Sequence, residues 1–113
     1  MKYEIQKISR IVDVMIDFYL SRSAKKTNFS IEEKKGKFII NVYAEQIDCN
    51  YEKIEEMKEL LNVQRQREME EYYWQLAGND IDGEEINLIG MMVDEATVEY
   101  NCPSLEITLI RYK

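Results

Sequence analysis

Apolar residues in the first part of the chain recur at the spacing of a helix. From Ile5 to Ala24 they fall at positions that an α-helix places on one face. The members of this apolar face are Ile8, Ile11, Val12, Met15, Ile16 and Tyr19. The pattern predicts a helix over Ile5–Ala24 that packs this face inward.

The period then changes from that of a helix to that of strands. Thr27–Lys34 and Lys37–Glu45 read as two strands, joined at Lys35-Gly36. Glycine accepts the positive backbone angle that a tight hairpin turn requires. The segment therefore predicts a β-hairpin directly after the first helix.

A second helix is predicted over Asn50–Leu76, a segment without glycine or proline that is rich in good helix formers. Asn50 stands where its side chain would cap the first turn. Two apolar stripes run along the segment, the first formed by Ile54, Met57, Leu60, Leu61 and Gln64, the second by Met69, Tyr72, Tyr73 and Leu76. The stripes are out of phase around Asn62–Arg67, which predicts a bend or break there.

The last third of the chain combines both periods. Helical spacing of Ile86, Ile89, Gly90 and Val93 predicts a helix over Glu84–Val93. Alternation predicts strands over Ala96–Tyr100 and Leu105–Tyr112, with one buried face each. Asn101-Cys102-Pro103-Ser104 supplies the turn between them, since proline fixes its own backbone angle.

The order of these elements predicts an α/β two-layer sandwich. Its four strands form a mostly antiparallel sheet, and the helices cover one face of that sheet. A chain of 113 residues with few turn breakers is long enough to bury a single core. We expect one domain over residues 1–113.

The net charge of the chain limits the classes of partner that we expect. The chain carries 22 acidic and 15 basic residues, a net charge of -7. Nucleic acids and anionic membranes attract clustered lysine and arginine, so neither is expected as the main partner. The N-terminal residues lack the apolar run of a signal peptide, and we expect a cytoplasmic protein.

Side chains for catalysis are scarce. Histidine is absent, which removes the commonest general base near neutral pH and the Cys/His zinc patterns. The two cysteines, Cys49 and Cys102, are too few and too far apart in sequence for a metal site, and we expect free thiols. The sequence predicts no catalytic residue, no metal site and no cofactor.

The C-terminal residues resemble the end of the histidine-kinase-like (GHKL) ATPase domain, nearest its anti-sigma-factor kinase branch. Gly83 matches the first glycine of that family's GLGL box, Val93-Asp94-Glu95-Ala96 matches the end of the following helix, and Ile107–Tyr112 resembles the closing strand. In the first helix, Asp13 and Asp17 fall where the family has a glutamate and a magnesium-holding asparagine. The resemblance implies that these positions and Gly83 line a former nucleotide pocket.

Three departures from the family predict that ATP binding is lost. Glu85 replaces the second box glycine and would place a carboxylate beside the phosphates. Ala44–Asp48, where the adenine-reading box is expected, has no glycine and no aspartate in the matching place. The helix over Asn50–Leu76 replaces the family's short, flexible ATP lid. The resemblance therefore implies a degenerate domain.

Asp13 and Asp17 have two readings. On an amphipathic helix, acidic residues four positions apart usually form a solvated surface. Paired carboxylates on one face can also bind a divalent cation. The second reading keeps open a residual magnesium-dependent ATP-binding protein or serine kinase.

Tyr72, Tyr73 and Trp74 are the candidate interface. As neighbours in sequence they point to different faces of a helix, so at least one lies away from the core. We expect a homodimer or a partner complex that buries Tyr73 or Trp74. The function predicted is a non-catalytic bacterial regulatory or protein-interaction module, with a sigma factor or its antagonist as partner by analogy with the family. A structural homo-oligomer is the remaining alternative.

Overall fold

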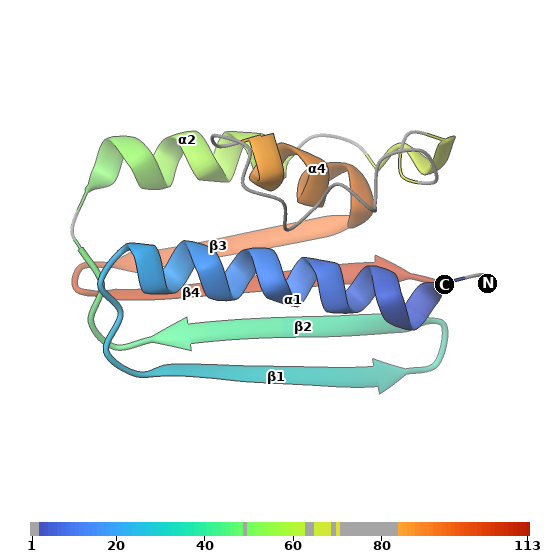
Figure 1. The fold of residues 1–113 in the computed structure, drawn as a ribbon, viewed down its shortest axis with the longest axis horizontal. Coiled ribbons are helices and arrows are strands. Elements are labelled where there is room, and N and C mark those ends of the chain that lie inside the picture. The colour runs from blue at the N-terminus through green and yellow to red at the C-terminus, as the bar shows by residue number, and fades with distance from the viewer. Residues whose placement is uncertain (1–2, 49, 63–64, 69, 71–83) are drawn as a thin grey trace.

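A computed structural model describes residues 3–48, 50–62, 65–68, 70 and 84–113. Figure 1 shows the arrangement of the elements, whose labels follow the chain from the N-terminus. They are α1 (Glu4–Ser21), β1 (Thr27–Lys34), β2 (Lys37–Ala44), α2 (Tyr51–Leu61), α4 (Glu84–Met92), β3 (Glu95–Asn101) and β4 (Ser104–Tyr112). The predicted helices and strands are thus present, and most of their ends differ by a few residues. The exception is the helix predicted over Asn50–Leu76, because α2 ends at Leu61 and much of the remaining segment lies outside the described residues.

The strands form one four-stranded sheet in the order β1-β2-β4-β3. Each neighbouring pair is antiparallel, with Ile31 opposite Ile40, Ile40 opposite Leu109 and Val98 opposite Ile107. Residues opposite each other in such a ladder project from the same face of the sheet. The predicted α/β sandwich with a mostly antiparallel four-stranded sheet is confirmed.

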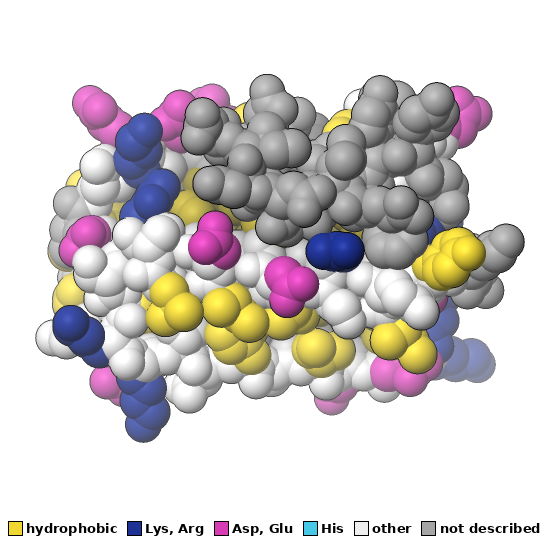
Figure 2. Space-filling model, in the orientation of Figure 1, with side chains coloured by type: hydrophobic (Ala, Val, Ile, Leu, Met, Phe, Trp, Pro, Cys, Tyr) yellow, Lys and Arg dark blue, Asp and Glu magenta, His cyan; other side chains and the backbone are white. Residues whose placement is uncertain are grey.

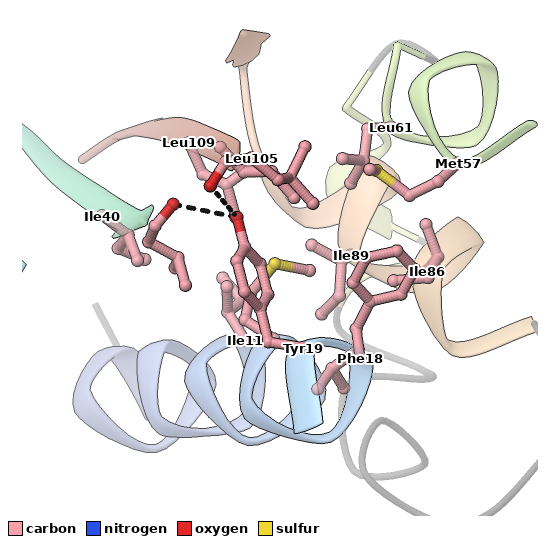
Figure 3. Packing of buried hydrophobic residues seen from close by; sticks show 14 of the residues in the cluster. Ile11, Phe18, Tyr19, Ile40, Met57, Leu61, Ile86, Ile89, Leu105 and Leu109 are labelled. Carbon is pink, nitrogen blue, oxygen red and sulfur yellow. Dashed lines mark hydrogen bonds between the residues drawn. The ribbon is translucent and has the colours of Figure 1, made fainter. Parts of the chain in front are cut away.

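One face of the sheet is buried under the helices. Its central positions are fully buried: Ile40, Val42 and Ala44 of β2 and Leu105, Ile107 and Leu109 of β4. Figure 3 shows side chains of α1, α2 and α4 meeting these strands. The Tyr19 hydroxyl, also fully buried, donates to the carbonyl oxygens of Val42 (2.9 Å) and Leu105 (3.3 Å). The core therefore lies between the helices and this inner face.

The structure confirms two local predictions, the hairpin turn at Gly36 and the helix start at Asn50. Gly36 has a φ of 79°, the left-handed conformation expected for the hairpin turn. The side chain of Asn50 accepts a hydrogen bond from the backbone N–H of Lys53 at 3.2 Å and caps α2. This helix ends at Leu61, within one residue of the predicted break.

The buried face of α1 differs in part from the prediction. Ile8, Ile11, Met15 and Tyr19 are buried as expected, but Ile16 is 37% exposed and Val12 is only half-buried. In their place the helix buries Lys7, Val14 and Phe18. The helix is rotated toward α4, and its opposite flank, which carries Val12 and Ile16, has no helix of the described chain over it.

Candidate functional site

The predicted acidic pair lies on the surface. Asp13 and Asp17 are exposed on α1. The described residues contain no group of three or more His, Cys, Asp or Glu that could hold a metal ion. The exposure of Asp13 and Asp17 agrees with their interpretation as solvated surface residues.

The other predicted positions lie mostly outside the described residues. This applies to Gly83 of the former glycine box and to the candidate interface at Tyr72, Tyr73 and Trp74. Glu85 belongs to α4, although its side chain is not among those described. The nucleotide positions and the aromatic interface both stay predictions.

A cluster of buried charges joins distant parts of the chain, and we call it the buried ion network. It consists of Glu4 and Lys7 from α1, Arg65, Glu70, Asp94 and Arg111. Arg111 is fully buried, and its guanidinium donates to Glu4 at 2.6 and 3.0 Å and to Glu70 at 2.9 and 2.6 Å. The network therefore ties the start of α1 to the end of β4.

Glu70 is the centre of this network. Its carboxylate also accepts from Lys7 Nζ at 2.8 Å and from Arg65 Nε at 3.1 Å. Burial alone would favour the neutral acid, but the hydrogen bonds from Arg111, Lys7 and Arg65 hold the pKa of Glu70 at about 2. Glu70 is thus a permanent anion among cations at neutral pH.

The outer part of the network fixes the end of the sheet. Arg65 Nη1 donates to Asp94 Oδ2 and to the carbonyl of Tyr112, each at 2.8 Å. The same Asp94 oxygen accepts the backbone N–H of Tyr112 at 2.7 Å. Three cations and three anions make up the network, so their formal charges cancel. We interpret the network as structural, because its charges are paired within the protein.

Sequence reasoning missed this network, although a signal for part of it existed. Arg111 continues the buried alternation of Leu105, Ile107 and Leu109 along β4. A buried arginine requires carboxylate partners. That rule predicts an acid near Arg111, but it does not identify Glu4 or Glu70.

An exposed apolar row lies on the flank of α1 that faces away from α4. Ile5, Ile16 and Leu20 are 77%, 37% and 60% exposed, and half-buried Val12 lies between them. Their spacing of 7, 4 and 4 residues keeps them on one side of a helix. Single exposed apolar residues are ordinary, whereas an aligned row along a helix is typical of a contact surface.

The row continues onto the uncovered edge of the sheet. Phe29 and Ile31 of β1 pair with Val42 and Ile40, so they lie on the inner, helix-covered face. Figure 1 shows β1 as the outer edge of the sheet, while α1 runs along its middle. Ile31 consequently stays 53% exposed. We call Ile5, Val12, Ile16, Leu20, Phe29 and Ile31 the α1–β1 surface.

Charged side chains border the α1–β1 surface unevenly. Figure 2 shows apolar side chains following this side of the molecule, with acidic groups beside them. Asp13 and Asp17 stand three residues before Ile16 and Leu20 and so lie next to the apolar row on α1. Lys25 and Lys26 are exposed beyond the C-terminal end of α1. Two carboxylates therefore border the row along the helix, with half-buried Arg10 next to Asp13, and lysines border the row at one end.

Two further observations bear on the sequence predictions. Cys102 is disulfide-bonded, so the expectation of a free thiol at this position was wrong. Spacing along the sequence does not reveal which segments the fold brings together.

Among the described helices, none is long and apolar enough to cross a membrane.

Comparison with known proteins identified no relative. A scan against protein-family models, a search of curated proteins and a search of solved structures each found no match to this chain.

Proposed function

We propose that this chain is a non-catalytic regulatory module of bacteria that acts by binding another protein. The observation that carries the proposal is the α1–β1 surface, an aligned apolar row beside an uncovered strand. Leaving such side chains in water costs about 25 cal/mol for each Å² that a partner could bury. Its four exposed members can be reached by a partner without unfolding of the domain: Ile5, Ile16, Leu20 and Ile31.

Glu70 of the buried ion network is not suited to acid–base catalysis. Glu70, whose pKa is held at about 2, is 3% exposed and held by three cations. A general acid or base requires access to substrate and a pKa nearer the working pH. Glu70 meets neither condition.

The resemblance to anti-sigma-factor kinase domains supplies the class of partner. By that analogy, the partner is a sigma factor or its antagonist, and self-association through Tyr73 or Trp74 belongs to the same proposal. Fold-level analogy does not by itself establish function. The α1–β1 surface is independent of the analogy and supports the protein-binding part of the proposal without it.

We also propose a cytoplasmic location, and one observation argues against it. Disulfides are rare in the reducing cytosol, and Cys102 is disulfide-bonded. Alkylation of intact cells followed by mass spectrometry of the Cys102 peptide measures which state exists in the cell.

Site-specific photo-crosslinking in the cells that produce the chain tests the proposed function. A photoreactive phenylalanine analogue replaces Leu20 in one variant and Tyr51 in a control, residues that are 60% and 62% exposed. We expect one discrete protein adduct from position 20, reduced by a further Ile16→Asn substitution, and none from position 51. A folded chain that gives no adduct at position 20, or the same adducts at both positions, would contradict the proposal.

A further inference from the structure

We propose that the α1–β1 surface binds a basic amphipathic α-helix of the partner protein. The inference rests on the proposed binding function and adds the shape and charge of the partner segment. Three observations support it: the direction in which the apolar side chains face, the length of their row, and the acidic residues beside them.

The direction of the side chains favours a helix over an added strand. A strand pairing with the free edge of β1 would satisfy backbone groups in the plane of the sheet. The exposed Ile31 instead projects from the inner face of the sheet, the face on which α1 lies with the flank of Ile16 and Leu20 exposed (Figure 1). An element lying on that face beside α1 contacts both, and a helix has the matching diameter of about 10 Å.

The length of the row sets the length of the partner segment. Ile5 and Leu20 are 15 residues apart in α1. At 1.5 Å per residue they lie about 22 Å apart along the helix axis. A partner helix of about four turns, with apolar residues at i, i+3, i+4 and i+7, covers this distance.

The charged residues beside the row determine which residues we expect next to the apolar face of the partner helix. Asp13 and Asp17 lie beside the row, so lysine or arginine next to the partner's apolar face would meet them. On β1, Glu33 is exposed and pairs with Lys113, while the Glu32–Lys34 pair lies on the opposite face of the sheet. Lys25 and Lys26 border only the C-terminal end of α1. Arg10, which is half-buried, stands three residues before Asp13 on α1. The two carboxylates outnumber this cation, so the charge on α1 beside the middle of the row is net negative.

The same charges disfavour a second copy of this chain as the occupant. In a two-fold pairing of α1 with its copy, the middle of the row lies near the axis. Asp13 follows Val12 there, so the two copies would bring like carboxylates together. The net charge of -7 adds repulsion between copies.

Fluorescence anisotropy with designed peptides tests the inference. The probe is a fluorescein-labelled Leu/Lys peptide, with leucine at helical spacing and the length of α1, 18 residues. A Leu/Glu peptide of the same pattern and a scrambled Leu/Lys peptide serve as controls. We expect the chain to bind the patterned Leu/Lys peptide at least about tenfold more tightly than either control, a difference of about 1.4 kcal/mol.

Variants of the chain locate the binding. Ile16→Asn with Leu20→Asn should weaken Leu/Lys binding about tenfold or more, while Tyr51→Asn, which removes an equally exposed aromatic elsewhere, should not. Asp13→Lys with Asp17→Lys should invert the preference, so that the Leu/Glu peptide binds more tightly. Circular dichroism checks folding, and the charge inversion tests the inference even if the asparagine variant does not fold.

Several results would overturn the inference. Binding that ignores peptide pattern or survives the asparagine variant in folded form would show nonspecific attraction of a basic peptide. If the variant with Asp13→Lys and Asp17→Lys still preferred the Leu/Lys peptide, the binding would likewise be nonspecific. Binding to phosphatidylserine vesicles that is lost in the asparagine variant would assign the surface to membranes. If crosslinking at position 20 succeeds but these peptides do not bind, the binding function stands and only the helical, basic partner segment is rejected.

Discussion

Glu70 shows how a single residue can depend on the whole fold for its ionisation. It is nearly inaccessible to solvent and carries a negative charge, which would be costly without partners. Arg111, Lys7 and Arg65 provide those partners, and Arg111 also lowers the pKa of Glu4 through its hydrogen bonds. Removing one member leaves the others buried and incompletely paired, which typically costs 3–5 kcal/mol.

The pKa of Glu70 predicts a loss of stability in acid. Its pKa falls from 4.5 in the unfolded chain to about 2 in the folded protein. The folded state therefore binds this proton less tightly, so the stabilisation is complete above about pH 5 and is lost as the pH falls toward 2. We expect Glu70 to contribute roughly 3 kcal/mol to the decrease in the free energy of unfolding across this window.

Urea unfolding at several pH values and constant ionic strength measures this effect. A Glu70→Gln variant should be less stable at pH 7 and show a flatter dependence between pH 5 and 2. Glu99→Gln, at an exposed position on β3, should follow the wild type. A Glu70→Gln variant that loses as much stability as the wild type over this window would show that Glu70 is not the residue responsible.

At the scale of elements, β4 is the strand that most constrains the fold. It lies between β2 and β3, its inner positions are buried, and its last inner residue is Arg111 of the buried ion network. The two faces of the same strand therefore differ sharply. Leu109 faces the core, while the neighbouring Thr108 faces outward and accepts a hydrogen bond from Asn41 at 3.0 Å.

Substitutions at these neighbouring positions should separate the two faces of β4. Leu109→Ala should lower the free energy of unfolding by about 2–5 kcal/mol, since it removes buried methyl groups and leaves a cavity. Thr108→Ala should cost about 1 kcal/mol or less, because it removes one partly exposed hydrogen bond. Chemical unfolding of both variants measures the difference, and equal losses would contradict the assigned faces.

At the scale of the whole molecule, the helices leave one edge of the sheet uncovered. The helix α1 packs across the middle strands and turns one apolar flank outward, while β1 extends the inner face beyond it (Figure 1). This arrangement creates the α1–β1 surface. It also places Asp13 and Asp17 on the exterior of the domain, beside that surface.

The exposure of Asp13 and Asp17 predicts no response to nucleotide. A ligand raises the melting temperature only if it binds the native state in preference to the unfolded chain. We expect no rise with millimolar magnesium-ATP, measured by differential scanning fluorimetry. Asp17→Ala is the matched control. A dose-dependent rise in the wild type that this substitution abolishes would favour the alternative of a residual ATP-binding protein or kinase.

Local patterns in the sequence determined most of the helices and strands and the buried face of β4. Alternation along β4 predicted that Ile107 and Leu109 are buried, because side chains of a strand alternate between two faces wherever the strand lies. Gly36 and Asn50 marked a turn and a helix start for equally local reasons. Those predictions needed no knowledge of which segments meet.

Only the tertiary structure decided the strand order, the rotation of α1 and the partners of the buried charges. Helical spacing allowed more than one buried flank on α1, and packing against α4 selected the flank with Val14 and Phe18 over that with Ile16. Lys7 pairs with Glu70 across 63 positions, and Arg111 with Glu4 across 107. Such contacts depend on the packing of distant elements, which no local period encodes, and the same packing leaves the α1–β1 surface exposed.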